Sequence, residues 1–256
     1  MIGIHPASGQ EYQDSEEEAP ESLKERARPF DEVTITDEIY EQSYIFPALI
    51  DSFPPLQPVV RDSYLTFEPR SYYFHRKFSD GRVAEAWAMG GAASHQSGWW
   101  RDILKWGATV YTSQRLYGPL DRDGTGLLQV NQQPYTALGQ AYLKVKLRHS
   151  VATLYRQEID IPYINRNDIR MTPRTFEGYT ITSEEFDRVK LIAGHLTEMK
   201  DRTSDTFEPL SVAAGAPGSN EGVTLGGVSF EFTENLRAGV VNSYGWETFN
   251  FFYSEA

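Results

Sequence analysis

Arginine side chains lie at two places in the sequence where they could act together. In segment 70–76, Arg70 and Arg76 share one parity and would point to the same side of an extended strand. Segment 159–174 holds a second charged group, together with prolines that stiffen both of its ends. A guanidinium group forms two parallel hydrogen bonds with a planar carboxylate, so such groups favour carboxylate binding. The charged residues of the second segment include Arg166, Asp168, Arg170 and Arg174.

Strands must position these arginines, and the chain from residue 62 onward is a series of short runs rich in aromatic and β-branched residues. Run 135–147 is the clearest, because its odd positions are apolar or small and its even positions include Thr136, Gln140 and Lys144. Such period-two alternation predicts one strand with a single apolar face, longer than most strands of soluble domains. We expect nine strands, with a tenth that opens near residue 249. They cover 64–76, 84–95, 104–115, 135–147, 150–158, 175–183, 186–199, 223–233 and 236–244.

The links between these runs differ in length. Residues 184–185 and 234–235 are predicted hairpin turns, whereas other links are long loops. Short turns at one end and long loops at the other suit an up-and-down meander of hairpins. The fold class expected is therefore all-β and antiparallel.

The first part of the chain has a different composition. Residues 1–60 hold 13 of the 36 acidic side chains and 3 of the 24 basic ones, which gives −10 of the total net charge of −12. The segment also contains the proline-rich stretch 53–58. We predict an acidic, largely unstructured leader over residues 1–61 and a β-region over residues 62–256. Residues 1–5 have neither the basic nor the apolar region of a secretory signal.

Composition excludes several classes of function. The acidic balance argues against nucleic-acid binding, which needs a basic face. The sequence has no cysteine, so thiolate metal sites and thiol nucleophiles are absent. The five histidines share no metal-ligand spacing, and no catalytic or cofactor motif is present, so we expect neither an enzyme nor a cofactor. A run of apolar residues long enough for a transmembrane helix is also missing.

Alternation alone leaves two structures open. In a soluble sandwich, the apolar face of each strand points into a core. In an outer-membrane barrel it points at lipid, and the polar face points into the lumen. Aromatic residues near strand ends favour the barrel, whereas a soluble all-β domain that binds a carbohydrate or another ligand remains the alternative. These aromatic residues are Tyr72, Tyr73, Trp99, Trp100, Phe249, Phe251, Phe252 and Tyr253.

Four segments resemble motifs of the OprD family of outer-membrane porins, in the family's order and with its spacing. They are RSYYFHR at 70–76, GTGLL at 124–128, NDIRMTPRTFEG at 167–178 and AGHLTE at 193–198. The resemblance extends over residues 62–245 and does not cover the leader. It implies a closed transmembrane antiparallel barrel of about 18 strands, of which residues 62–256 would be a truncated N-terminal half with the first nine or ten.

The resemblance also implies a function. It would be passive uptake of small, carboxylate-containing solutes, such as amino acids and aromatic or other organic acids, across an outer membrane that contains lipopolysaccharide. An oligosaccharide-selective member of the family is an alternative. The expected partners are small solutes and the lipid bilayer, without nucleic acid, and both a monomer and a homotrimer are open.

The same resemblance assigns site residues. It places Arg76 and Arg82 in a basic ladder along the lumen, and the parity of the first strand adds Arg70. Arg82 would open the second strand after a turn at 79–81. Segment 159–174 would fold into the barrel as a constriction loop, in which Arg170 matches the family motif. Such arginines attract carboxylates in a narrow water-filled passage. The simpler alternative is ordinary strand-end arginines and an exposed polar loop. The expected constriction residues are Arg170, Asp168 and Arg174.

Overall fold

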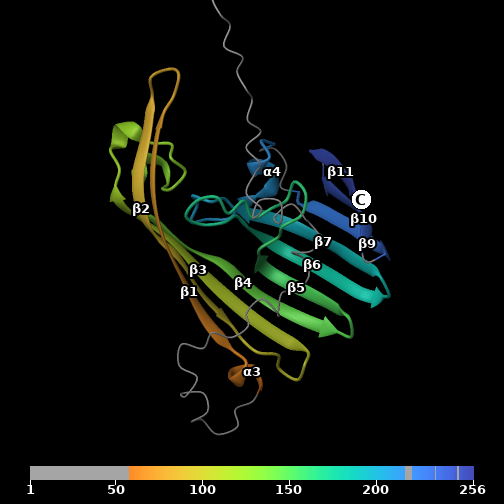
Figure 1. Cartoon of the computed structure of the whole chain (residues 1–256). Helices are drawn as coiled ribbons and strands as arrows, with labels where there is room; N and C mark the ends of the chain where they lie inside the picture. Colours follow the sequence, from red (N-terminus) through yellow and green to blue (C-terminus); the bar gives the residue numbers. More distant parts are fainter. Residues whose placement is uncertain (1–57, 217–220, 234, 247) are drawn as a thin grey trace, which may run out of the picture.

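The computed structural model describes residues 58–216, 221–233, 235–246 and 248–256 (Figure 1). The predicted leader, residues 1–61, lies outside the described residues except for the short helix α3 (Pro58–Arg61). None of the helices in the described ranges is long and apolar enough to cross a membrane.

The described chain is almost entirely β-structure, as the alternation predicts. Ten long strands follow one another in one antiparallel sheet, and a two-residue strand, β8, pairs with β7 beside this path. The strands are β1 (Tyr64–Lys77), β2 (Val83–Gln96), β3 (Leu104–Tyr117), β4 (Tyr135–Leu147), β5 (Ser150–Gln157), β6 (Thr175–Phe186), β7 (Val189–Lys200), β8 (Glu208–Pro209), β9 (Val223–Thr233), β10 (Leu236–Gly245) and β11 (Phe249–Glu255). The remaining elements are α4 (Leu210–Ala213) and the 3-10 helices η1 (Leu120–Arg122) and η2 (Val130–Gln132).

The sheet is curved, with β1 at one edge and β11 at the other, and its two ends differ (Figure 1). Helix α3 lies at the end that carries the turns 148–149 and 187–188. Links 118–134, 158–174 and 201–222 lie at the opposite end, because consecutive strands run antiparallel. Outer-membrane barrels have short turns on the periplasmic side and longer loops outside. We call these two ends the short-turn end and the long-loop end.

One predicted hairpin turn is wrong. Residues 184–185 belong to β6, which continues to Phe186, and the turn consists of Asp187 and Arg188. Arg188 has a φ of 61°, the left-handed conformation that a tight hairpin turn needs. The Glu185 carboxylate accepts a hydrogen bond from the His149 backbone N–H at 3.0 Å. The acidic pair therefore extends β6 past the neighbouring turn instead of forming one.

The single apolar face predicted for run 135–147 is also wrong, because β4 contains a bulge. The pairing with β3 shifts at Gly139, which faces Tyr111 so closely that a Cβ atom would lie 2.3 Å from the ring. Before the bulge, the odd residues Tyr135 and Ala137 are buried. After it, the odd residue Leu143 is exposed on the other face. A bulge adds one residue, so the same parity points to opposite sides of the sheet.

Large apolar side chains cover the convex face of the sheet. Leu65 and Phe67 of β1 are 60% and 67% exposed. Leu154 of β5 and Tyr179 of β6 are direct cross-strand partners on the same face, and both are exposed. A soluble sandwich would bury such a face against a second layer, whereas a barrel presents it to lipid. The exposed apolar face therefore identifies the fold as a transmembrane antiparallel β-barrel rather than a soluble sandwich.

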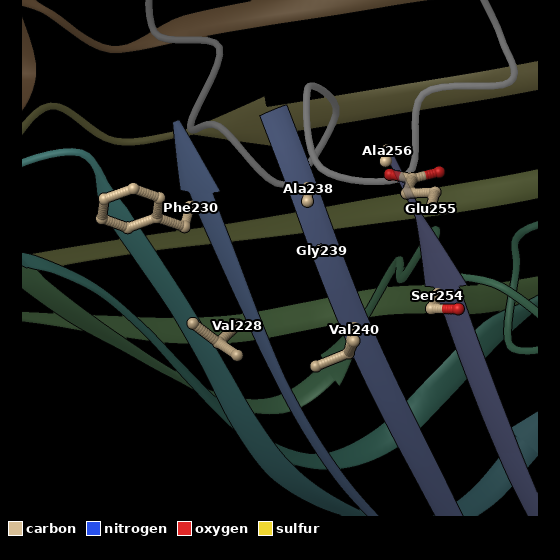
Figure 2. Close-up of a pocket in the computed structure, with 8 residues that line it drawn as sticks. All are labelled: Val228, Phe230, Ala238, Gly239, Val240, Ser254, Glu255 and Ala256. Carbon is tan, nitrogen blue, oxygen red and sulfur yellow. The ribbon is translucent and has the colours of Figure 1, made fainter. Parts of the chain in front are cut away.

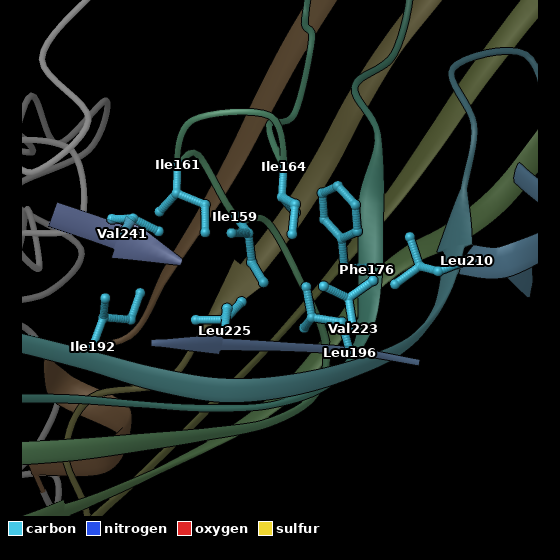
Figure 3. Packing of buried hydrophobic residues seen from close by; sticks show 10 residues of the cluster. All are labelled: Ile159, Ile161, Ile164, Phe176, Ile192, Leu196, Leu210, Val223, Leu225 and Val241. Atoms are coloured by element: carbon cyan, nitrogen blue, oxygen red, sulfur yellow. The ribbon is translucent and has the colours of Figure 1, made fainter. Parts of the chain in front are cut away.

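The opposite, inner face of the sheet is packed at the long-loop end. Link 158–174, which we call the inward loop, contributes three isoleucines to an apolar cluster on this face (Figure 3). The strands contribute side chains from β6, β7, β9 and β10, including Phe176 and the fully buried Leu196. A second cluster joins Leu127 and Leu128 of link 118–134 to Met171 and to alanines of β2. Both loops are therefore held against the inner face by apolar burial. The first cluster consists of Ile159, Ile161, Ile164, Phe176, Ile192, Leu196, Leu210, Val223, Leu225 and Val241.

Candidate functional site

The inward loop starts from a carboxylate that the neighbouring strands hold. Glu158 follows β5, and its Oε1 atom accepts hydrogen bonds from the Tyr111 hydroxyl at 2.6 Å and from the Gln140 amide at 3.0 Å. Its Oε2 atom accepts a hydrogen bond from Arg166 of the loop at 3.3 Å. Tyr111 is buried on β3, and Gln140 directly follows the bulge glycine of β4. The bulge thus turns an amide toward the inner face, where it fixes the start of the loop.

The middle of the inward loop is bound to the first strand. Arg70 of β1 donates to Asp168 through both terminal nitrogens, with Nη2 2.8 Å from Oδ2 and Nη1 2.5 Å from Oδ1. Nη1 also lies 3.2 Å from the Arg170 carbonyl oxygen. The Arg70 side chain is 30% exposed and that of Asp168 14% exposed, so the pair is partly screened from water. This bidentate pair, which we call the Arg70–Asp168 clamp, joins two residues that were predicted separately, one for the ladder and one for the loop.

Arg170 lies beside the clamp but has a different environment. Its guanidinium carbon is 4.8 Å from the centre of the Phe74 ring and 5.7 Å from that of Tyr72. Both rings belong to β1 and share the parity of Arg70. Its described hydrogen bond goes to a backbone carbonyl, that of Ile169, at 3.3 Å. Within the described part of the chain, no carboxylate of the protein neutralises Arg170, and its positive charge lies among aromatic rings on the inner face.

The end of the inward loop is anchored through Arg174 and Lys200. Arg174 Nε lies 2.8 Å from Asp201 Oδ1, so Arg174 is neutralised by the protein itself. Burial alone would raise the pKa of Asp201, but the hydrogen bond from Arg174, helped by the charge of Arg202, holds it below its usual range. Lys200, the last residue of β7, is fully buried and donates to the carbonyl oxygens of Pro173 and Asp201, each at 3.0 Å.

The other two predicted ladder residues lie at the far end of the first hairpin. Arg76 and Arg82 stack on the same ring, with guanidinium carbons 4.8 and 5.0 Å from the centre of Phe78. Arg82 does not open the second strand as predicted, because the turn extends one residue further and the Phe78 N–H donates to the Arg82 carbonyl oxygen. The Arg82 side chain is 75% exposed and pairs with Asp80 at 2.6 Å.

The structure thus gathers three of the six predicted residues, Arg70, Asp168 and Arg170, at one place on the inner face. Arg76 and Arg82 form a separate pair at the hairpin tip, and Arg174 lies at the loop end. That these six residues line a solute path remains a prediction. Sequence reasoning missed Tyr111, Gln140, Glu158 and Lys200.

Two further features lie apart from this group. A hollow of about 460 Å³ between β9, β10 and β11 is lined mainly by small and apolar side chains, including Val228, Phe230 and Val240 (Figure 2). Those three side chains are exposed on the convex face, so this hollow is not on the side of the inward loop. Among the described residues, no three histidine or acidic side chains lie together as a metal site.

A curved antiparallel sheet with an apolar outer face and a loop folded over its inner face defines an outer-membrane β-barrel of the porin class. Comparison with family models supports this class, since one described as "outer membrane porin, OprD family" matches residues 58–250. The chain belongs to the OprD family of outer-membrane porins, as the sequence motifs predict. The outer-membrane location follows, and porins of this family are not enzymes.

Two curated relatives come from Pseudomonas. Porin D of Pseudomonas aeruginosa is 28% identical over 196 residues, which cover 73% of this chain and 43% of the relative. Porin-like protein GalP of Pseudomonas putida is 25% identical over 194 residues, which cover 70% of this chain and 47% of the relative. The chain therefore spans about half the length of the curated relatives it matches.

Solved structures of similar fold include two from Pseudomonas aeruginosa. OccK9 (OpdG) superposes with a TM-score of 0.67 at 23% identity, over 77% of this chain and 54% of that one. OpdK, solved with vanillate, superposes with a TM-score of 0.66 at 20% identity, over 77% of this chain and 52% of that one. At these identities the superpositions show the fold alone.

Proposed function

We propose that this chain forms the N-terminal half of a substrate-selective outer-membrane porin, which takes up small carboxylate-containing solutes by passive diffusion. Residues 62–256 would then be the barrel part and residues 1–61 a separate leader. Such a channel makes and breaks no covalent bond, so its selectivity depends on the shape and charge of its lumen. The solutes expected are amino acids and aromatic or other organic acids.

The observation that carries the proposal is the state of Arg170. The other two arginines of the inward loop are occupied, Arg166 by Glu158 and Arg174 by Asp201. Arg170 lies beside the clamp with no carboxylate partner among the described residues. Its guanidinium group is therefore available to bind a solute carboxylate, and it would act at the narrowest part of the lumen.

The neighbouring rings suggest which carboxylates fit best. Tyr72 and Phe74 place two aromatic faces within about 6 Å of the charge, close enough to contact a ring attached to the carboxylate. OpdK, whose fold is similar, was solved with vanillate, which is an aromatic carboxylate. Exposed rings also suit sugar stacking, so an oligosaccharide-selective channel is the second candidate.

Planar-bilayer recording of the full-length gene product tests the proposal. We expect an anion-preferring channel whose current is reduced by benzoate or vanillate. Arg170→Ala should lower the apparent affinity for these solutes about tenfold, which corresponds to one charge-assisted hydrogen bond of about 1.5 kcal/mol. Arg170→Lys should retain the anion preference but lose part of the affinity, because it keeps the charge without the planar fork.

Arg188→Ala is the matched control, since it removes a guanidinium from the exposed turn at the short-turn end. It should change neither anion preference nor affinity. A channel that ignores carboxylates but is blocked by neutral oligosaccharides would replace the first candidate with the second. Anion preference unchanged in Arg170→Ala would refute the role of this arginine.

A further inference from the structure

Three lysines gather on the inner face of the sheet at the short-turn end. Lys105 of β3 lies directly opposite Lys144 of β4 in the strand register. Lys105 and Lys146 place their Nζ atoms 5.7 and 5.5 Å from the centre of the Trp99 ring, in the β2–β3 link. We call these four residues the lysine–tryptophan patch.

The patch faces inward, on the same side as the inward loop. Lys105 and Tyr111 alternate with the exposed Trp106 and Val110 on β3, and Tyr111 contacts Glu158. On β4, Lys144 and Lys146 follow the bulge and share the parity of Gln140, which contacts the same carboxylate. The lysines are therefore on the lumen side of the sheet.

Charge at this patch favours an anion. Like charges placed directly opposite each other in an antiparallel pair repel, and Lys105 with Lys144 is such a pair. Asp102 pairs with Lys146 at 3.0 Å, but its side chain is 77% exposed, so water weakens that interaction. A carboxylate-rich segment that reached the patch would relieve the repulsion between the ammonium groups.

The acidic N-terminal segment leaves the described structure beside this patch. Helix α3 is fixed to the β2–β3 link, because the Gly98 N–H donates to the Val59 carbonyl oxygen at 3.0 Å. A Cβ atom on Gly98 would lie 2.3 Å from the Pro58 carbonyl oxygen, so the two backbones touch next to Trp99. The 57 residues before Pro58 hold 13 acidic and 3 basic side chains, and they end within one residue of this contact. The nearest of those carboxylates, Asp51, can lie at most about 25 Å from Pro58 along an extended chain.

We propose that the acidic segment, residues 1–57, docks on the lysine–tryptophan patch from the short-turn side. Carboxylates of the segment pair with the three ammonium groups, and the tether at α3 keeps the local concentration of the segment high. The docked segment covers the inner face at this end of the sheet and competes there with anionic solutes. Because the contact is electrostatic, salt weakens it.

Zero-length carbodiimide coupling tests the proposal on the full-length gene product folded in detergent micelles. The reagent joins amines and carboxylates that are in contact, and peptide mass spectrometry then identifies the joined residues. We expect Lys105, Lys144 or Lys146 joined to acids of residues 11–51, with at least a fivefold loss of these products in 1 M salt. Lys77, at the far end of β1, is the internal control and should give no such product.

A second measurement does not depend on coupling chemistry. In the Lys105→Gln/Lys144→Gln/Lys146→Gln variant, Glu-specific protease should cleave residues 11–41 at least fivefold faster than in the unmodified protein. Lys77→Gln should leave that rate unchanged. Docking is refuted if no patch lysine couples to the segment, or if Lys77 couples equally well. Equal cleavage rates in the triple variant and the unmodified protein would refute it independently, and retention of anion selectivity in that variant would separate this result from the proposed solute path.

Discussion

Replacing Arg70 with alanine should release the inward loop from the first strand. The clamp consists of two charge-assisted hydrogen bonds between side chains that are 30% and 14% exposed. Exposed ion pairs contribute about 0–1 kcal/mol, whereas breaking a buried pair costs about 3–5 kcal/mol. The partial exposure of the Arg70–Asp168 pair places its contribution between these limits, at about 2–3 kcal/mol. The population of loop detached from β1 should therefore rise about 30- to 150-fold.

Trypsin can measure this population, because the inward loop carries cleavage sites at Arg166, Arg170 and Arg174. When opening and closing are fast, the cleavage rate of a folded protein follows the fraction of open loop. We expect cleavage between residues 158 and 174 to be about 30- to 150-fold faster in Arg70→Ala than in the unmodified protein in detergent. Arg188→Ala should leave the rate of loop cleavage unchanged.

A double-mutant cycle makes the test specific for the clamp. Asp168→Ala should accelerate cleavage to a similar extent, and Arg70→Ala/Asp168→Ala should be little faster than either single variant, because the same interaction is lost in all three. Arg70→Lys should be intermediate, since it keeps the charge but cannot form the bidentate pair. Acceleration of less than about threefold in both single variants, or fully multiplicative effects in the double variant, would show that the clamp does not hold the loop.

Two further predictions concern the bulge and the loop end. Gly139→Val should destabilise the folded barrel, because a Cβ would lie 2.3 Å from the Tyr111 ring, and Gly139→Ala should do so less; heat-modified gel mobility would report both, and normal folding of the valine variant would contradict the bulge geometry. The pKa of Asp201 is held below its usual range, so its pair with Arg174 stabilises fully above the usual aspartate pKa and less as the pH falls through the lowered one. Asp201→Asn should therefore melt below the unmodified protein at pH 7, and this difference should shrink in acid; a difference independent of pH would argue against the pair.

Much of the fold could be predicted because period-two alternation is a local property. The strand positions along the chain agree with the predicted runs to within a few residues. The bulge at Gly139 could not be predicted, because apolar residues on one parity before it and on the same parity after it form one unbroken pattern. The turn near residues 184–185 was misplaced because two glutamates resemble a turn, whereas β6 extends through them to cap the turn at His149.

The candidate site was predictable only in part. The parity of Arg70 and the motif around Arg170 indicate residues on the inner face, but neither indicates which groups are neutralised within the protein. Arg70 and Asp168 are 98 residues apart, and only the curvature of the sheet and the path of the loop bring them together. Glu158 carried one weak signal, since it is an acid at a strand end eight residues before Arg166.

The pairing of each long strand with the next along the chain also has a consequence for the order of assembly. Hairpins can join the sheet one at a time from β1 toward β11, since each addition closes only a short segment of chain. The Arg70–Asp168 clamp and the contact of Lys200 with Tyr111 span far longer segments. Neither contact can form until β1 to β7 already lie side by side. The features that narrow the inner face are thus among the last to form, so a partly assembled sheet is wider inside than the finished one.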